Sequence, residues 1–172
     1  VKVMQENWIG KSVGANIKFK VDKVEKETIQ VFTTRADTLC GVTFLAISVN
    51  HTLIKKITEK NILSKIDKLK NYLKDNNEKD HKKIGIKTNL IAINPINLEK
   101  IPIWIASYVV DQYGTGAVMG VPAHDQRDFE FAKTNSINIK QVIIKERKVN
   151  ASELKIALTE NGFLINSGEF NG

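Results

Sequence analysis

The stretch ANIKFKVDKVEKETIQVFTT, residues 15–34, decides the fold class of this chain. In its first part the apolar residues Ile17, Phe19 and Val21 alternate with lysines, which is typical of a strand with one buried face. A charged turn follows, and ETIQVFTT then supplies a second β-prone run. We therefore predict an antiparallel hairpin over residues 14–34.

Further short β-prone runs are spread along the chain. They are GVTFLAISVN (41–50), LIAINP (90–95), IPIWIASYVV (101–110), GAVMGVP (116–122) and IKQVIIKE (139–146). Many short strands with helices inserted late predict an α+β fold, in which flanking helices surround a curved or closed, β-barrel-like core. No internal repeat or long linker divides the sequence, so we expect residues 1–172 to form a single domain.

Helical spacing is clearest in a segment rich in Lys and Asn at about 52–83. Leu63, Ile66 and Leu69 recur there at intervals of three, as on the apolar face of an amphipathic helix. We predict that this face packs on the core and that the lysines are solvated. A nucleic-acid-binding arm is the alternative.

Two shorter helices are predicted nearer the end of the chain. In DQRDFEFAKTN (125–135), Asp125 is a suitable N-cap, because its carboxylate can accept from a free backbone N–H of the first turn. In SELKIALTENGF (152–163), Ser152 is the expected cap and Gly162 the expected end.

Composition limits the function classes. The formal net charge is +7, which favours a polyanionic partner, although an AT-rich genome would also produce a bias toward Lys, Asn and Ile. No apolar run approaches the roughly 20 residues that span a bilayer. Cys40 is the only cysteine, so an internal disulfide framework and a Cys-rich zinc site are excluded, and we expect a buried structural thiol.

The motif TTRADT (33–38) is unusual for a turn between two apolar runs, where Gly, Asn or Pro would be ordinary. It instead gathers three threonines around one cation and one anion. This composition predicts a polar binding site at the end of a strand.

A second polar motif lies in YGTGAVMGVPAHDQRDFEFA (113–132). Its glycines superficially match a dinucleotide fingerprint, but they lead into a β-type run stopped by Pro122 rather than into a helix, so we do not expect a dinucleotide site. His124, Asp125 and Asp128 could contribute to a metal site, yet the sequence offers no further ligands. For Asp125, helix capping and direct catalysis are equally open. For Asp128, the alternative is a surface ion pair with Arg127 or Lys133.

Taken together, TTRADTLCGVTF, IPIWIASYVVDQYGTGAVMGVPAHDQRDFEFA, ALTENGFLINSGEFNG and the opening ENWIGKSVGA resemble the editing (connective-polypeptide) domain of bacterial-type leucyl-tRNA synthetases. The resemblance covers nearly the whole chain and is weakest over residues 55–83. It implies the fold shared by the editing domains of valyl-, isoleucyl- and leucyl-tRNA synthetases. The missing initiator Met is consistent with a domain excised from a larger synthetase.

The activity that the resemblance implies is hydrolytic editing, meaning deacylation of tRNA(Leu) mischarged with norvaline, isoleucine or methionine. It implies three groups of site residues. The catalytic group is Thr33, Thr34 and Asp128. The specificity group is Thr38, Met119 and Val121. The group that binds the substrate and the tRNA end is Arg35, Tyr113, Asp125 and His124.

The resemblance also implies individual roles. Thr38 fills the space that the branched side chain of leucine would need, and Asp128 binds the α-ammonium of the substrate. Thr33 and Thr34 bind the ester, the ribose or the attacking water, and Arg35 binds the terminal nucleotide. This sequence departs from the usual family pattern at Ala36, Cys40 and Gly120, where Pro, an aromatic residue and Ala are usual.

By the same resemblance, editing needs no cofactor and no metal, whereas ATP and Mg²⁺ serve the synthetic domain of the parent enzyme. The expected partners are the 3′ end of mischarged tRNA(Leu) and the rest of a monomeric synthetase in the cytoplasm or an organelle, with no membrane.

Two alternative functions stay open. One is a module that binds tRNA ends without hydrolysis, and the other is a metal-dependent hydrolase that uses His124, Asp125 and Asp128.

Overall fold

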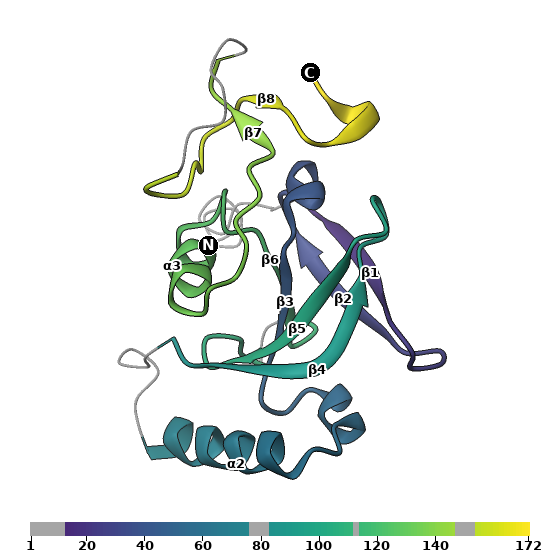
Figure 1. Cartoon of the computed structure of the whole chain (residues 1–172), viewed down its shortest axis with the longest axis vertical. Coiled ribbons are helices and arrows are strands. Elements are labelled where there is room, and N and C mark those ends of the chain that lie inside the picture. Colours follow the sequence, from purple (N-terminus) through teal and green to yellow (C-terminus); the bar gives the residue numbers. More distant parts are fainter. Residues whose placement is uncertain (1–12, 76–82, 112–113, 147–153) are drawn as a thin grey trace, which may run out of the picture.

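The computed structural model describes residues 13–75, 83–111, 114–146 and 154–172. A sheet of six strands forms its centre, in the order β2-β1-β4-β5-β3-β6 (Figure 1). The strands are β1 (Ala15–Val21), β2 (Thr28–Thr33), β3 (Phe44–Ile47), β4 (Gly85–Ile93), β5 (Lys100–Ala106) and β6 (Ala117–Gly120). A separate small hairpin pairs β7 (Ile143–Ile144) with β8 (Phe163–Leu164).

The hairpin predicted over residues 14–34 is confirmed. β1 and β2 pair antiparallel from Ala15↔Thr33 to Lys20↔Thr28. The alternating apolar residues point into the core, and Phe19 and Ile29 are fully buried. Because side chains alternate across a strand, this register leaves the intervening lysines on the outer face.

The sheet curves until its two edge strands meet. β2 and β6 stand at opposite ends of the hydrogen-bonded order, yet they lie in contact with each other. The ladder does not continue between them among the described residues, so the core resembles a barrel that is not closed. This arrangement confirms the predicted α+β class with a barrel-like core. It also leaves a seam between β2 and β6 at which side chains can form a site.

Helices flank this core as predicted. After the short 3₁₀ turns η1 (Ala36–Gly41) and η2 (Thr52–Lys56), helix α2 (Lys60–Asp75) packs its apolar face beside β4 (Figure 1). Ile66 and Leu69 on that face are buried, which confirms the amphipathic helix in the Lys/Asn-rich segment. Residues 76–82 lie outside the described part of the chain.

Helix α3 (Gln126–Thr134) also lies where the sequence predicts it. The Asp125 side chain accepts from the N–H of Asp128 at 3.0 Å, so Asp125 is the N-cap. Phe129 and Ala132 are buried on the inner side of the helix. Cys40 is buried too, as expected for a structural thiol.

Two predictions near the end of the chain are wrong in part. The strand expected over 139–146 is limited to β7. The helix expected over 152–163 is absent from residues 154–162, and its expected cap, Ser152, lies outside the described residues. The Leu158 N–H donates to the Ala123 carbonyl at 2.8 Å instead of to its own segment. Gly162 therefore ends no helix; it precedes β8 and lies against the backbone of Ile144. A last 3₁₀ turn, η4 (Gly168–Phe170), follows.

The departure from the family pattern at Gly120 has a packing reason. A Cβ at this position would lie 2.2 Å from Cε1 of Phe44, whose fully buried ring stacks on Phe131. Gly120→Ala is expected to lower the free energy of unfolding by about 1–3 kcal/mol, as overpacking of a dense core does. Urea unfolding measures this. In a Phe44→Leu background the same change should cost less, and an equal cost in both backgrounds would contradict the steric explanation.

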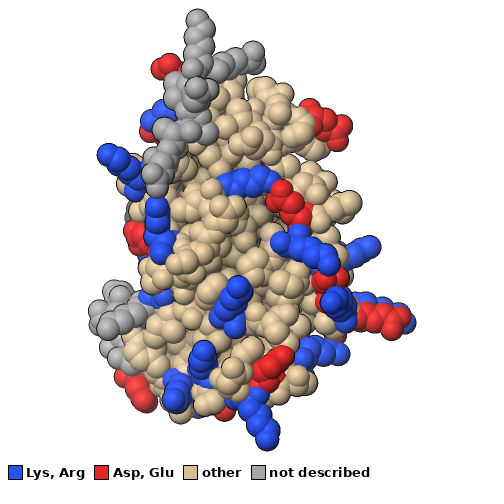
Figure 2. Space-filling view, viewed as in Figure 1, with Lys and Arg blue, Asp and Glu red and all other residues tan. Residues whose placement is uncertain are grey.

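On the face shown in Figure 2, positive charge is not gathered into one patch. Figure 2 shows lysine and arginine side chains distributed over the visible face, with acidic side chains among them. Several are paired, as in Lys100–Asp22 at 2.8 Å and Lys140–Glu99 at 2.6 Å. Within the described residues, no helix is long and apolar enough to cross a membrane.

Candidate active site at the open seam of the sheet

A hollow of about 260 Å³ lies where the loop after β2, strand β6 and the start of α3 meet. It joins the two polar motifs, which are far apart in the sequence. The predicted site residues that the structure describes all line it: Thr33, Thr34, Arg35, Thr38, Met119, Val121, His124, Asp125 and Asp128. Tyr113 lies outside the described residues. A volume just below the usual range of small-molecule pockets suits an aminoacyl group better than a whole nucleotide.

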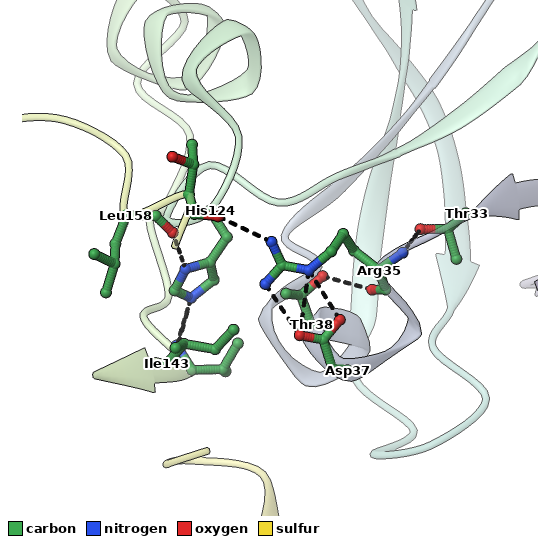
Figure 3. Close-up of polar contacts among 9 residues, drawn as sticks. Thr33, Arg35, Asp37, Thr38, His124, Ile143 and Leu158 are labelled. Atoms are coloured by element: carbon green, nitrogen blue, oxygen red, sulfur yellow. Dashed lines mark hydrogen bonds and ion pairs between the residues drawn. The ribbon is translucent and has the colours of Figure 1, made fainter. Parts of the chain in front are cut away.

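The loop formed by TTRADT (33–38), here called the threonine loop, is held in shape by hydrogen bonds among its own polar groups. The Thr33 hydroxyl accepts from the Arg35 N–H at 3.0 Å, and the Thr38 hydroxyl donates to the Arg35 carbonyl at 2.8 Å (Figure 3). Thr38 is only 1% exposed. Its side chain is therefore fixed both by packing and by a hydrogen bond, so it forms a rigid part of the wall.

The Arg35 side chain is held at the mouth of the hollow by contacts with two segments. Its Nε donates to Asp37 Oδ1 at 3.1 Å and its Nη2 to Asp37 Oδ2 at 3.0 Å, while Nη1 donates to the Thr159 carbonyl at 3.2 Å (Figure 3). Asp37 thus orders the loop. The guanidinium stays partly exposed, which leaves it able to meet an anionic group.

Asp128 is a buried carboxylate that also forms an ion pair with Arg127, the partner that the alternative interpretation named. The residue is 2% exposed, and its Oδ2 accepts from the Val121 N–H at 2.9 Å. Its Oδ1 has no hydrogen-bond partner among the described residues and lies 3.5 Å from Nε of Arg127. Burial, followed by the neighbouring charge of Asp125, raises the pKa of Asp128 to about 6.

Two residues next to Asp128 were not predicted as part of the site. The Arg127 guanidinium lies 4.7 Å from the centre of the Tyr108 ring, in the geometry of a cation–π contact. Burial, and then the charge of Asp128, raises the pKa of Tyr108, so the phenol stays protonated. Arg127 could have been found from its place in HDQRD, whereas nothing local in the sequence marks Tyr108.

His124 lines the hollow, but the hydrogen bonds of its ring go to other segments of the chain. Its Nδ1 donates to the Leu158 carbonyl at 2.9 Å, and its Nε2 accepts from the N–H groups of Val142 and Ile143 at 3.0 and 3.2 Å (Figure 3). Both ring nitrogens are therefore used, and neither is left for a substrate or a metal ion. His124 instead fastens two late segments of the chain to the turn before α3.

This bonding gives a testable pH dependence. Because burial lowers the pKa of His124 in the folded chain, protonation favours the unfolded state, whose histidine pKa is about 6.5. The stabilisation is present above that pH and is lost as pH falls. His124→Gln should therefore reduce the free energy of unfolding by about 1–3 kcal/mol at pH 7 and by less at pH 5. Urea unfolding of both proteins measures this. An equal difference at both pH values would contradict it, since other titrating groups are common to both proteins.

The chain matches the family model described as "Leucyl-tRNA synthetase, editing domain" over residues 6–172. It is 70% identical over 172 residues to the leucine–tRNA ligase of Prochlorococcus marinus subsp. pastoris, covering all of this chain and 20% of that protein. It is 47% identical over 180 residues to the leucine–tRNA ligase of Mycoplasmopsis pulmonis, again over the whole chain and 21% of the relative. The chain thus spans about a fifth of the length of these relatives.

Comparison with a solved structure also points to leucyl-tRNA synthetases. The fold is similar to a chain of the ternary complex of Agrobacterium radiobacter LeuRS with tRNA and LeuAMS, with a TM-score of 0.68 and 32% sequence identity. The match covers 88% of this chain and 18% of that chain. With the sequence matches, it shows that this chain belongs to the editing-domain family of leucyl-tRNA synthetases.

Proposed function

We propose that this domain hydrolyses the ester bond of tRNA(Leu) that carries norvaline, isoleucine or methionine, as the editing part of a leucine–tRNA ligase. The observation that supports this most directly is the meeting of a rigid threonine loop and a buried carboxylate, Asp128, in one small hollow. A fixed carboxylate recognises an α-ammonium. The hollow can therefore distinguish an aminoacyl ester from other esters.

A second site of this kind is needed because size alone separates similar amino acids poorly. One methylene in an apolar pocket is worth only about 1–3 kcal/mol of discrimination. A hydrolytic site that spares leucine must therefore exclude it by shape. Thr38 suits this task, because its buried side chain cannot move aside without losing its hydrogen bond to the Arg35 carbonyl.

Hydrolysis itself needs little chemical help from the protein, because an aminoacyl ester is already activated. The Thr33 hydroxyl accepts from the Arg35 N–H, and within the described residues its own hydrogen has no acceptor, so it can donate to an ester oxygen or to water. Thr34 lies beside it at the exposed rim. Orientation of a water molecule and hydrogen bonds to the developing oxyanion would supply the catalysis.

The remaining roles follow from position. Met119 and Val121 are buried on the side of β6 and shape the apolar part of the hollow. Arg35 would bind the terminal nucleotide of tRNA, and Asp125 supports Asp128 by capping α3.

The tRNA 3′ end and the rest of the synthetase are the proposed partners, in a monomeric cytoplasmic enzyme. The ATP and Mg²⁺ used in aminoacylation would belong to the synthetic domain, and editing would need neither.

The direct test is deacylation of norvalyl- and isoleucyl-tRNA(Leu) by the domain, with leucyl-tRNA(Leu) as the control and EDTA present. Selective loss of the wrong amino acid is the expected result. Loss that disappears with EDTA would instead support the metal-dependent hydrolase, for which His124 has no free nitrogen. If nothing is released, grafting the domain into a full-length synthetase separates a binding module from a site that needs the parent enzyme.

The pH profile provides a further prediction. Because Asp128 must be ionised to bind an ammonium, and its pKa is raised to about 6, deacylation should fall by half near pH 6 and continue to fall below it. Initial rates between pH 4.5 and 8, corrected for hydrolysis without protein, measure this. A midpoint near pH 4, the ordinary value for an aspartate, would show that the raised pKa is not that of the working group.

A further inference from the structure

The ammonium-binding position of Asp128 already has a cation beside it. Nε of Arg127 lies 3.5 Å from Asp128 Oδ1, the oxygen that has no hydrogen bond among the described residues. The same guanidinium lies 4.7 Å from the centre of the Tyr108 ring. A carboxylate oxygen together with an aromatic face is a favourable environment for any organic cation, including an amino acid ammonium.

The parts of this arrangement differ in how freely they can move. The Asp128 side chain is 3% exposed and is held by the Val121 N–H. The Tyr108 ring packs edge-on against Phe131, with centroids 5.4 Å apart. The Arg127 side chain, in contrast, is 43% exposed. The carboxylate and the ring are therefore fixed, and the guanidinium can leave.

We infer that Arg127 is a resident cation that occupies the ammonium position of Asp128 in the empty site and is displaced when the α-ammonium of the substrate enters. Tyr108 is the positioning residue that holds the guanidinium there. This inference rests on the proposed function, because it specifies how the site of that function recognises its substrate. Among the described residues, the charged or titratable groups that face Asp128 are Asp125 at the N-cap of α3, Arg127 on α3 and Tyr108 after β5.

Displacement adds selectivity to the site. Only a ligand with its own positive charge can replace the guanidinium without leaving a buried carboxylate unpaired, and an unpaired buried charge is unfavourable. An ester whose amine is blocked has no such charge. Arg127 would therefore keep Asp128 closed to uncharged esters and would lower the affinity for the correct cation by a modest factor.

The experiment uses two probes that cannot be hydrolysed. One is adenosine with L-norvaline linked as an amide to a 2′-amino group, and the other is the same compound acetylated on the amino acid nitrogen. Binding to the 172-residue chain is followed by NMR titration, which measures weak affinities. Neither probe carries a phosphate, so any contact between an arginine and the tRNA backbone does not enter the measurement.

Arg127→Gln should tighten binding of the free-amine probe by about 3- to 10-fold, which is the range for loss of a partly exposed cation–π contact and ion pair. The acetylated probe should gain nothing. Lys133→Gln is the matched control, because it removes one positive charge from the same helix, away from the hollow, and it should change neither affinity. Tyr108→Leu, which removes the ring face, should tighten the free-amine probe by a smaller factor, and Tyr108→Phe, which keeps the ring face, should tighten it less than Tyr108→Leu does.

The pH dependence of binding gives a readout that a purely structural role would not change. The Arg127 cation lowers the pKa of Asp128, so Arg127→Gln should move the acid midpoint of free-amine binding to higher pH. Lys133→Gln should leave that midpoint in place.

Two results would overturn the inference, namely weaker binding of the free-amine probe by Arg127→Gln, or equal tightening of both probes. Asp128→Asn separates this failure from failure of the proposed function. If Asp128→Asn leaves free-amine binding unchanged, Asp128 is not the ammonium-binding group, and both the proposed function and the resident-cation inference fail. If Asp128→Asn abolishes that binding while Arg127→Gln fails to tighten it, only the resident cation is wrong.

Discussion

Replacement of Asp128 by alanine is expected to lower kcat/KM for deacylation of norvalyl-tRNA(Leu) by about 30-fold or more. Loss of one member of a buried charge pair costs roughly 2–5 kcal/mol, and each 1.36 kcal/mol is a factor of ten in rate. The carboxylate is buried at the wall of the hollow, and Oδ1, which has no hydrogen bond among the described residues, is the oxygen proposed to bind the substrate ammonium. Deacylation assays at saturating and limiting substrate measure the effect.

The control for this prediction is Asp128→Asn. An asparagine oxygen can still accept from the Val121 N–H, so the turn before α3 should keep its structure while the negative charge is lost. Activity should be lost in both variants, and urea unfolding should show that Asp128→Asn stays folded. Full deacylation by folded Asp128→Asn would show that the ammonium is bound elsewhere.

Thr38→Ala is expected to make the domain hydrolyse leucyl-tRNA(Leu), which the proposed function requires the unchanged domain to spare. The alanine removes a methyl and a hydroxyl group from a buried position of the wall, so the branched side chain of leucine gains room. A steric term of this size is worth about 1–3 kcal/mol, or roughly 10- to 200-fold in the rate for leucine relative to norvaline. Parallel assays with the two charged tRNAs measure the ratio.

Thr38→Val tests whether shape or the hydroxyl is responsible. Valine keeps the volume of threonine but cannot donate to the Arg35 carbonyl. If the wall is steric, Thr38→Val still spares leucine, whereas Thr38→Ala does not. Continued sparing of leucine by Thr38→Ala would remove Thr38 from the specificity role.

Local sequence signals predicted the regular elements well. Alternation in β1 and β2, three-residue spacing in α2 and the Asp125 cap of α3 are all effects between near neighbours, so they can be recognised without the rest of the chain. The helix predicted over 152–163 was wrong because its decisive bonds are not local. Ala123 and His124 provide partners for the backbone of Leu158, and no pattern within that segment shows them.

For the candidate site, too, some features could be predicted from the sequence and others depend on the fold. The residue types of TTRADT and HDQRD, with their resemblance to a known family, determined which side chains would form the site and that they would belong together. Only the tertiary structure decided how each of these side chains is buried and which groups it contacts. Curvature of the sheet brings β2 against β6 and buries Asp128, and no group in the described part of the chain forms a hydrogen bond with its Oδ1. The same folding uses both nitrogens of His124 and sets Arg127 against Tyr108, since burial and partners depend on segments that approach only when the chain folds.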